Sequence, residues 1–279
     1  MRLRHGLALL IAIPLVLLVG GRVTSAAPVT TSLHTMVVGG LTRAYRTTQP
    51  ARVPESTIPV IVLLHGRAMT PAAMSDLTEF DRYATQAVLV YPAGFRNSWN
   101  AGGCCGPADT SNVDDVTFLR QVVRSVLASV PGTDPARVYL VGYSNGGRMA
   151  FRMACADPLL FAAYVAVEAV PVQPCATPTP VRLMVVASTG DPLLAIPPGG
   201  RPHRPGGQSQ PAVDDLITTW RRADGCPATS ASSQVGTLRL TSWSPCAAGS
   251  QVEVAIEAGG SHAWPASATT AAWNFLTGP

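Results

Sequence analysis

Lysine is absent from this chain, and all 20 of its positive side chains are arginine. Without a lysine amine, the protein has neither a Schiff-base lysine nor the lysine of a phosphate-binding P-loop. Charge of either sign is scarce, since charged residues make up 13% of the 279 residues and hydrophobic residues 47%. This balance excludes a solvated, disordered chain. The 25 glycines and 25 prolines follow no fixed period, which excludes a collagen-like chain.

The amino-terminal segment has the features of a secretory signal peptide. It opens with positive side chains, continues with an apolar run at 7–19 and offers small residues for cleavage at 24–27. The apolar run is shorter than the roughly 20 residues of a membrane-spanning helix, and Pro14 interrupts it. We therefore expect a signal peptide at residues 1–26 and one domain at 27–279, with an uncleaved anchor as the alternative.

Removal of the signal peptide changes the charge balance. Because Arg2, Arg4 and Arg22 lie within it, the mature chain keeps 17 arginines against 16 acidic residues. A nearly neutral chain lacks the basic footprint of nucleic-acid binding. We expect a secreted, extracellular protein with neither nucleic acid nor a stable membrane as its partner. The oligomeric state stays open.

Export would place the six cysteines in an oxidising environment, where disulfides form. They are Cys104, Cys105, Cys155, Cys175, Cys226 and Cys246. Six cysteines allow 15 pairings. Closeness along the chain favours Cys155 with Cys175 and Cys226 with Cys246, and leaves the adjacent pair to bridge to each other or elsewhere. A metal site is disfavoured, because the mature chain has no CxxC pair and four histidines.

Short apolar runs alternate with segments of helical spacing. The strand-like runs are 60–64, 87–91, 138–141, 162–167, 182–187 and 252–256, and helical spacing occurs at 116–130, 213–220 and 269–276. A hairpin is predicted at 35–46 and a surface loop at 197–211. This pattern predicts a single α/β domain with a mostly parallel sheet and helices on both faces. Since such sheets bind ligands at the carboxyl ends of their strands, functional residues should follow these runs.

A nucleophile-elbow pattern follows the run at 138–141. Residues 142–146 read Gly-Tyr-Ser-Asn-Gly and precede a helix-like segment, which is the strand–turn–helix context that the G-x-S-x-G motif requires. The pattern predicts Ser144 as a nucleophile. The alternative is a simple glycine-rich turn.

The serine hydroxyl needs a base, and in this fold the order along the chain is serine, acid, histidine. His34 and His65 lie upstream of the serine, and His203 lies in the predicted surface loop. Only His262 follows a late strand, so it is predicted to take the proton of Ser144.

The third member should be an acid that follows the run at 182–187. Asp191 occupies that position and would orient the histidine. Asp214 and Asp215 are rivals that fit the start of a helix better, and Glu168, which ends the preceding strand, is an outside candidate.

Backbone N–H groups are expected to form the oxyanion hole. One donor should be Asn145, which follows the nucleophile, and the other Arg67, which follows the run at 60–64. His65 is interpreted as a packed histidine bonded to backbone.

Six stretches occur in a fixed order and carry a family resemblance. They are LHG at 64–66, YPAG at 91–94, SWNAGGCCGP at 98–107, VDDV at 113–116, GYSNGG at 142–147 and GSHAWP at 260–265. From about residue 35 onward, the chain resembles the secreted poly(3-hydroxybutyrate) depolymerase family, which includes feruloyl-esterase-like and acetylxylan-esterase-like members. The resemblance implies an α/β-hydrolase fold, no cofactor, and Ser144, Asp191 and His262 as a catalytic triad. The family usually has His-Gly-Thr-x-Asp where this chain has Ala-Ser-Thr-Gly-Asp at 187–191.

Two tryptophans lie beside these motifs. Trp99 and Trp264 are candidates for lining the substrate cleft, or they pack the loops. The sequence therefore predicts a secreted serine esterase that cleaves hydroxyalkanoate esters through an acyl-enzyme. The alternatives are a feruloyl or acetylxylan esterase and a catalytically silent binding protein with a hydrolase fold.

Overall fold

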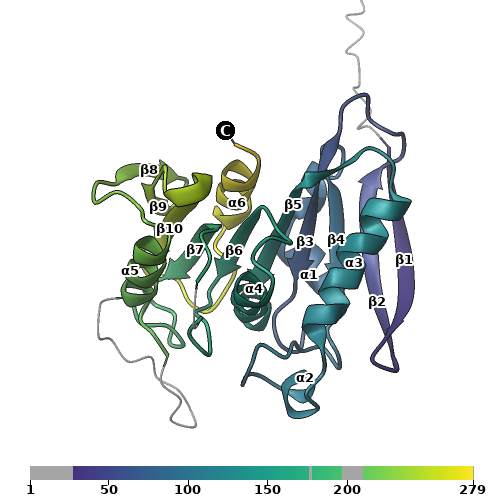
Figure 1. The fold of residues 1–279 in the computed structure, drawn as a ribbon, viewed down its shortest axis with the longest axis horizontal. Coiled ribbons are helices and arrows are strands. Elements are labelled where there is room, and N and C mark those ends of the chain that lie inside the picture. The colour runs from purple at the N-terminus through teal and green to yellow at the C-terminus, as the bar shows by residue number, and fades with distance from the viewer. Residues whose placement is uncertain (1–27, 176–177, 197–209, 279) are drawn as a thin grey trace, which may run out of the picture.

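The fold is built on one ten-stranded sheet, in the order β1-β2-β4-β3-β5-β6-β7-β10-β9-β8 (Figure 1). The computed structural model describes residues 28–175, 178–196 and 210–278. The strands are β1 (Val29–Val38), β2 (Leu41–Pro50), β3 (Ile58–Leu64), β4 (Val88–Pro92), β5 (Thr133–Tyr143), β6 (Ala163–Val167), β7 (Arg182–Ser188), β8 (Ala231–Val235), β9 (Leu238–Trp243) and β10 (Gln251–Glu257). The helices are α1 (Pro71–Thr78), α2 (Pro107–Thr110), α3 (Asp115–Ser129), α4 (Asn145–Ala156), α5 (Val213–Ala223) and α6 (Ala268–Thr277).

Two predicted segments cannot be compared with these elements. The expected signal peptide at 1–26 and nearly all of the predicted loop at 197–211, with His203, lie outside the described residues. Across the ranges that are described, no helix is both long and apolar enough to cross a bilayer.

The six central strands are parallel, as the continuous apolar runs predicted. Strands β4, β3, β5, β6, β7 and β10 pair in parallel, and every residue of β3 is buried. Val60, Val62 and Leu64 belong to one core cluster, and Ile61 and Leu63 to the other. Since successive side chains of a strand point to opposite faces, a run without polar residues requires cover on both sides.

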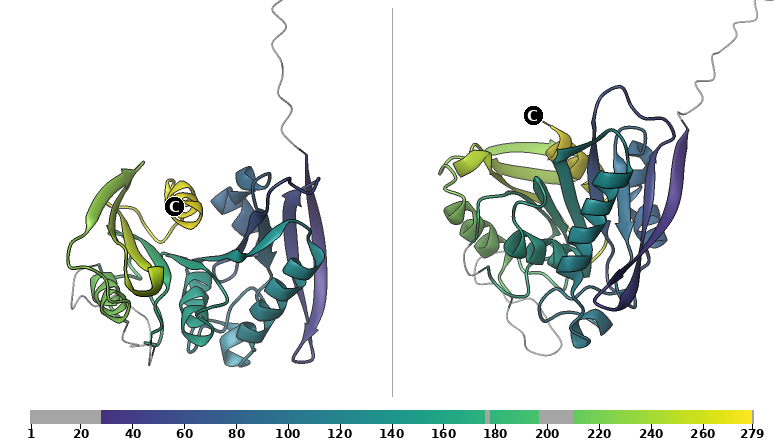
Figure 2. Two further views of the ribbon diagram at one scale, coloured as in Figure 1. Left: turned by 45° about the horizontal axis from the view of Figure 1, so that its top comes forward. Right: turned by 45° about the vertical axis from the view of Figure 1, so that its right-hand side comes forward.

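Helices supply that cover (Figure 2). The cluster on one face contains apolar residues of α3, α4 and α5, whereas the cluster on the other face contains residues of α1 and α6. The twisted sheet separates these two groups of helices. The expected fold class, an α/β domain with helices on both faces of a mostly parallel sheet, is confirmed.

Antiparallel hairpins extend the sheet at both ends. The amino-terminal hairpin β1–β2 turns at the predicted Gly39 and Gly40, and β2 continues onto β4. At the other end, β10 pairs with β9, and β9 with β8. The sequence reading missed this second hairpin, and it also missed α1.

Three disulfides are present, and the described residues include no free cysteine. Cys155 pairs with Cys175 and Cys226 with Cys246, which are the two pairs that closeness along the chain favoured. The adjacent Cys104 and Cys105 are joined to each other.

The parallel register aligns the carboxyl ends of the central strands. Leu64 is opposite Gly142, Tyr143 is opposite Val167, and Ser188 is opposite Glu257. The segments that begin at His65, Ser144, Glu168, Thr189 and Ala258 therefore leave the sheet at the same edge. These segments contain every predicted triad and oxyanion-hole residue.

Candidate active site

Ser144 lies in a strained turn between β5 and α4. Its φ of 52° and ψ of −115° are sparsely populated by residues other than glycine, and such a conformation costs about 1–3 kcal/mol. The flanking glycines explain why the turn can form. A Cβ on Gly142 would lie 2.2 Å from Gly146 O, and one on Gly146 would lie 2.2 Å from Leu64 O. Both positions must lack a side chain for β5, α4 and β3 to approach this closely.

The three predicted triad side chains lie within hydrogen-bonding distance of one another in series. Ser144 Oγ is 2.7 Å from His262 Nε2, and His262 Nδ1 is 2.7 Å from Asp191 Oδ2. The Asp191 side chain is fully buried, whereas 23% of the His262 side chain is exposed. The imidazole can therefore reach both the buried carboxylate and the serine at the surface.

Backbone bonds join the acid loop to the histidine loop. Gly190 N–H donates to Gly259 O at 2.8 Å, and Gly259 N–H donates to Thr189 Oγ1 at 2.8 Å. A Cβ on Gly190 would lie 2.2 Å from Gly260 O, so the two loops touch at that point. This contact fixes the relative positions of Asp191 and His262, which are 71 residues apart.

Asp191 is ionised although it is buried. Burial opposes its charge, but hydrogen bonds from His262, from Glu168 and from the Leu193 N–H outweigh burial and lower the pKa of Asp191. The Leu193 N–H donates to Oδ1 at 2.7 Å, so the oxygen opposite the histidine is also occupied. An anionic Asp191 holds His262 with its proton on Nδ1 and leaves Nε2 free to accept the serine proton.

The two expected oxyanion donors lie on segments that leave the sheet at the same edge, since Arg67 follows β3 and Asn145 directly follows Ser144 at the end of β5. Among the described residues, neither the Arg67 N–H nor the Asn145 N–H donates to a protein acceptor. His65 shapes the loop that carries Arg67. Its Nδ1 lies 2.8 Å from Gly66 O, and its Nε2 accepts the Gly94 N–H at 3.0 Å. Burial lowers the pKa of His65 despite its hydrogen bond to Gly66, so the ring is neutral and is occupied by backbone partners.

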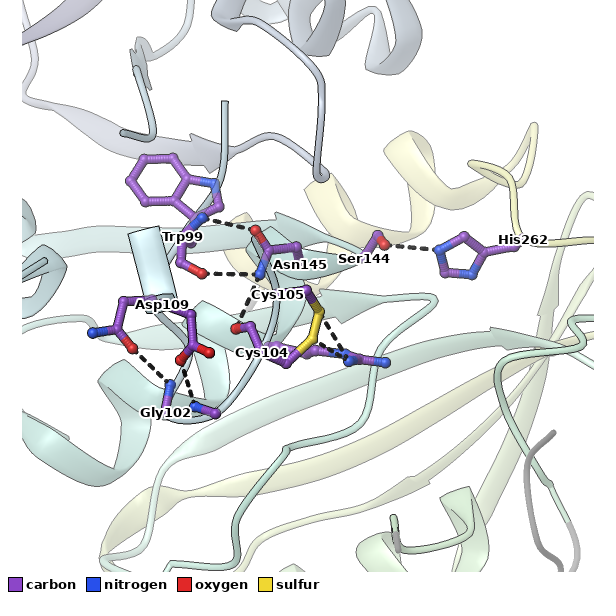
Figure 3. The surroundings of a disulfide bond; sticks show 11 residues. Trp99, Gly102, Cys104, Cys105, Asp109, Ser144, Asn145 and His262 are labelled. Carbon is purple, nitrogen blue, oxygen red and sulfur yellow. Dashed lines mark hydrogen bonds between the residues drawn. A yellow bond between two sulfur atoms is a disulfide. The ribbon is translucent and has the colours of Figure 1, made fainter. Parts of the chain in front are cut away.

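The Asn145 side chain clamps the loop that contains the adjacent cysteines (Figure 3). Its Oδ1 accepts the Trp99 N–H at 2.8 Å, and its Nδ2 donates to Trp99 O at 3.1 Å and to Cys104 O at 3.4 Å. Arg148, one turn further along α4, donates to Cys104 Sγ at 2.7 Å. Asn145 thus holds this loop with its side chain, while its backbone N–H directly follows Ser144.

Both candidate cleft tryptophans are buried. Trp99 is completely inaccessible, its indole N–H donates to His65 O at 2.9 Å, and its ring stacks on Phe118. Trp264 is 9% exposed, and its indole N–H donates to Thr269 Oγ1. Trp99 therefore packs the loop from within. The expectation that it lines the cleft is not supported, because no surface of its ring is exposed to a ligand.

The sequence reading overlooked Tyr143. Its hydroxyl donates to His262 O at 3.0 Å, and its ring stacks on the imidazole with the centroids 5.8 Å apart. Its position inside the elbow motif, directly before Ser144, was the signal in the sequence that could have identified it.

The rival acids belong to a helix rather than to the candidate triad. Asp214 and Asp215 are in the first turn of α5, as expected for helix-start residues.

One side-chain cluster has the composition of a metal site. Ligand atoms of Glu168, Asp191 and His262 all lie within 4.8 Å of one another. Both histidine nitrogens already face partners, since Nδ1 faces Asp191 and Nε2 faces Ser144. The donor set therefore fits proton transfer better than metal coordination.

Comparisons with known proteins identify the family of this chain. A family model described as "Putative esterase" matches residues 44–271. The chain is 30% identical to the "Putative esterase NocK" of Nocardia uniformis subsp. tsuyamanensis over 263 residues, which cover 86% of this chain and 75% of that protein. It is 36% identical to the "Feruloyl esterase B" of Piromyces equi over 58 residues, which cover 21% of this chain and 10% of that protein.

A solved structure shows the same fold. The S-formylglutathione hydrolase FrmB of Staphylococcus aureus superimposes with a TM-score of 0.59 at 14% identity, over 92% of this chain and 100% of that chain. The chain belongs to this esterase family of α/β-hydrolases and is a carboxylic ester hydrolase, so the alternative of a catalytically silent binding protein is not retained.

Proposed function

We propose that Ser144 is the nucleophile, His262 the general base and acid, Asp191 the orienting carboxylate, and the N–H groups of Arg67 and Asn145 the oxyanion hole. The observation that carries this assignment is the hydrogen-bonded series from Ser144 Oγ through both nitrogens of His262 to Asp191. The strained backbone at Ser144 supports it, because strain of this kind occurs at functional sites.

The assigned roles account for a complete ester hydrolysis. Ser144 Oγ attacks the ester carbonyl carbon while His262 Nε2 takes its proton, and the two N–H groups stabilise the oxyanion that forms. The protonated His262 then gives its proton to the leaving alcohol as the ester bond breaks, which leaves an acyl group on Ser144. Water, deprotonated by His262, attacks the acyl carbon and releases the carboxylic acid and the free serine.

We assign hydroxyalkanoate esters, such as oligomers of 3-hydroxybutyrate, as the substrate. The resemblance of the stretch at 98–107 to the depolymerase family supports this class. The hydrogen bonds between the Asn145 side chain and the Trp99 backbone hold that stretch close to Ser144. The match to a protein named feruloyl esterase supports hydroxycinnamate esters as the second candidate.

Replacement of the nucleophile tests the catalytic assignment. Ser144→Ala is expected to abolish hydrolysis of p-nitrophenyl butyrate and labelling by a fluorophosphonate probe, with an unchanged thermal unfolding midpoint. Ser129→Ala provides a matched control, since Ser129 lies at the exposed end of α3 and its hydroxyl donates to Ser125 O within the same helix. Wild-type turnover by the Ser144→Ala enzyme would remove the basis of the assignment.

The substrate class is tested by parallel assays at equal enzyme concentration. The wild-type enzyme is offered linear 3-hydroxybutyrate trimers, methyl ferulate and acetylated xylan, and kcat/KM is compared. The proposal expects the hydroxybutyrate trimer to be preferred. A higher kcat/KM on methyl ferulate would move the assignment to the feruloyl class.

We also propose that the protein is exported. The three disulfides support this location, because structural disulfides persist in oxidising compartments. Amino-terminal sequencing of the protein recovered from culture supernatant is expected to begin at or near residue 27. A protein that retains residue 1 and stays with the cells would contradict the proposal.

A further inference from the structure

A second carboxyl group lies directly behind the triad acid. Glu168 follows β6 at the edge of the sheet where Ser144 and Asp191 follow β5 and β7. It is 1% exposed, and one of its carboxyl oxygens lies within 4.8 Å of an Asp191 carboxyl oxygen and of a His262 ring nitrogen. The series of contacts that begins at Ser144 therefore continues past Asp191 to a fourth side chain.

The backbone at Glu168 has a strained conformation that the surrounding structure must hold in place. Its φ of 49° lies in the left-handed region, where a glutamate is strained, and its N–H donates to Val186 O at 2.8 Å. Val167 and Ala169 on either side are fully buried. A strained, buried glutamate beside the reacting groups points to a role in their arrangement.

Ser188 supplies donors to Glu168 from the other side. The Ser188 N–H donates to Oε2 at 3.2 Å and its hydroxyl donates to Oε1 at 2.5 Å. The same hydroxyl lies 3.3 Å from Glu257 Oε2. Among the residues that the structure describes, no arginine forms an ion pair with Glu168. The site therefore gives Glu168 hydrogen bonds but no compensating positive charge.

Two adjacent buried carboxyl groups cannot both be ionised at low cost. Asp191 receives the His262 Nδ1–H and the Leu193 N–H, so the shared negative charge is stabilised there. The proton then lies on Glu168, where it provides the donor that a hydrogen bond between two carboxyl groups requires. Burial is the main reason that the pKa of Glu168 is raised, and the neighbouring Asp191 raises it further, to about 9, against hydrogen bonds from Ser188 that lower it.

We propose that Glu168 is a positioning residue for the triad: in its neutral form it donates a hydrogen bond to Asp191, and it thereby fixes the carboxylate that orients His262. This inference rests on the proposed function of Ser144, His262 and Asp191. It adds a fourth member whose proton is required but is not transferred to the substrate.

The proposal predicts a specific pH dependence. Above about pH 9, Glu168 loses its proton, and two negative carboxyl groups then face each other beside His262. The other titratable groups that face this cluster are Tyr143, whose hydroxyl contacts the His262 backbone, and Glu257, which Ser188 links to Glu168. Repulsion displaces Asp191 from His262, so kcat falls while KM changes little.

Two substitutions at Glu168 separate the donor from the charge. Glu168→Gln keeps a neutral donor that does not titrate, whereas Glu168→Ala removes the donor. For p-nitrophenyl butyrate at pH 7.5, we expect Glu168→Gln to keep kcat within about threefold of the wild-type value. Glu168→Ala should lower kcat about tenfold or more at similar KM, because it removes one hydrogen bond to a charged group. Between pH 7 and 10.5, the alkaline fall of the wild-type kcat should be absent from Glu168→Gln.

A matched control uses another buried acid. Glu253 on β10 is 8% exposed, and burial raises its pKa to about 7, but it lies toward the opposite end of the strand from the site. Glu253→Gln should reproduce the wild-type alkaline fall. Thermal unfolding and fluorophosphonate labelling establish that each variant is folded with an accessible Ser144.

Two results would overturn the proposal. One is an alkaline fall in Glu168→Gln that coincides with the wild-type curve, and the other is a loss of kcat in Glu168→Gln as large as that in Glu168→Ala. If Glu168→Ala does not fold, the comparison of Glu168→Gln with the wild type still decides. Either negative result leaves the Ser144→Ala outcome unaffected, so a failure here is distinguishable from a failure of the proposed function.

Discussion

A substitution at Gly190 tests whether the loop that carries Asp191 must contact the loop that carries His262. A Cβ added there would lie 2.2 Å from Gly260 O, whereas ordinary contacts begin near 3.4 Å. Because its φ is not in the left-handed region, an alanine at this position is strained by the contact alone. The loops must separate by about 1 Å to admit the methyl group, and His262 lies two residues beyond Gly260. The 2.7 Å bond between His262 Nδ1 and Asp191 Oδ2 would be lost.

We therefore expect Gly190→Ala to lower kcat/KM for p-nitrophenyl butyrate about 100-fold, the usual result of a 1 Å misplacement of catalytic groups. That loss corresponds to about 2.7 kcal/mol of transition-state stabilisation. Overpacking should lower the free energy of unfolding by about 1–3 kcal/mol, as measured by urea titration. Gly39→Ala, at the β1–β2 turn with no heavy atom within 4 Å of the added Cβ, is the control and should keep wild-type kinetics. Wild-type kcat/KM in Gly190→Ala would refute the reasoning, since it would mean that the contact is not needed.

Two further predictions concern stability. Arg43→Met should lower the free energy of unfolding by about 3–5 kcal/mol in urea titration, because it leaves the fully buried Asp115 without its partner at 2.7 Å. Arg82→Met, which breaks an exposed pair with Glu79 at 3.9 Å, should cost less than about 1 kcal/mol, and equal effects of the two would contradict the prediction. The second prediction concerns pH. The folded protein keeps a proton on Glu168 that the unfolded chain releases near pH 4.5. Between about pH 5 and 9, the free energy of unfolding of the wild type should therefore fall by about 1.4 kcal/mol per pH unit relative to that of Glu168→Gln. Equal slopes for the two proteins would show that Glu168 does not titrate as described.

The central sheet and the elbow could be predicted from the sequence because both depend on local patterns. A continuous apolar run such as β3 requires cover on both faces, and the glycines around Ser144 correspond to contacts that no side chain permits. The helix at Asp115–Ser129 was also predictable, because Asp114 precedes it and accepts the Thr117 N–H.

The missed elements depend on pairing more than on local pattern. Strand β8 consists mostly of exposed polar residues at the edge of the sheet, and it forms because β9 pairs with it. The start of α1 had a local signal that was overlooked, since Thr70 caps a helix whose first residue is Pro71.

Within the site, the sequence could name the candidates but could not arrange them. Glu168 and Asp191 each follow a strand, and only the packing of β6 against β7 determines that Asp191 meets the histidine while Glu168 lies behind it. Trp99 shows the same limit. Its position beside a motif suggested a cleft, but its buried ring points inward, where the indole N–H donates to His65 O, 34 residues away, and the ring stacks on Phe118.

The double role of Asn145 has a consequence for redesign of this enzyme. Its backbone directly follows Ser144 and its side chain anchors the segment with the adjacent cysteines, so a shift of that segment would be transmitted to Ser144. Random mutagenesis aimed at new substrates should therefore recover few active clones with changes in this part of the chain. Libraries that leave residues 99–104 intact and vary exposed positions elsewhere around the site offer the better starting point.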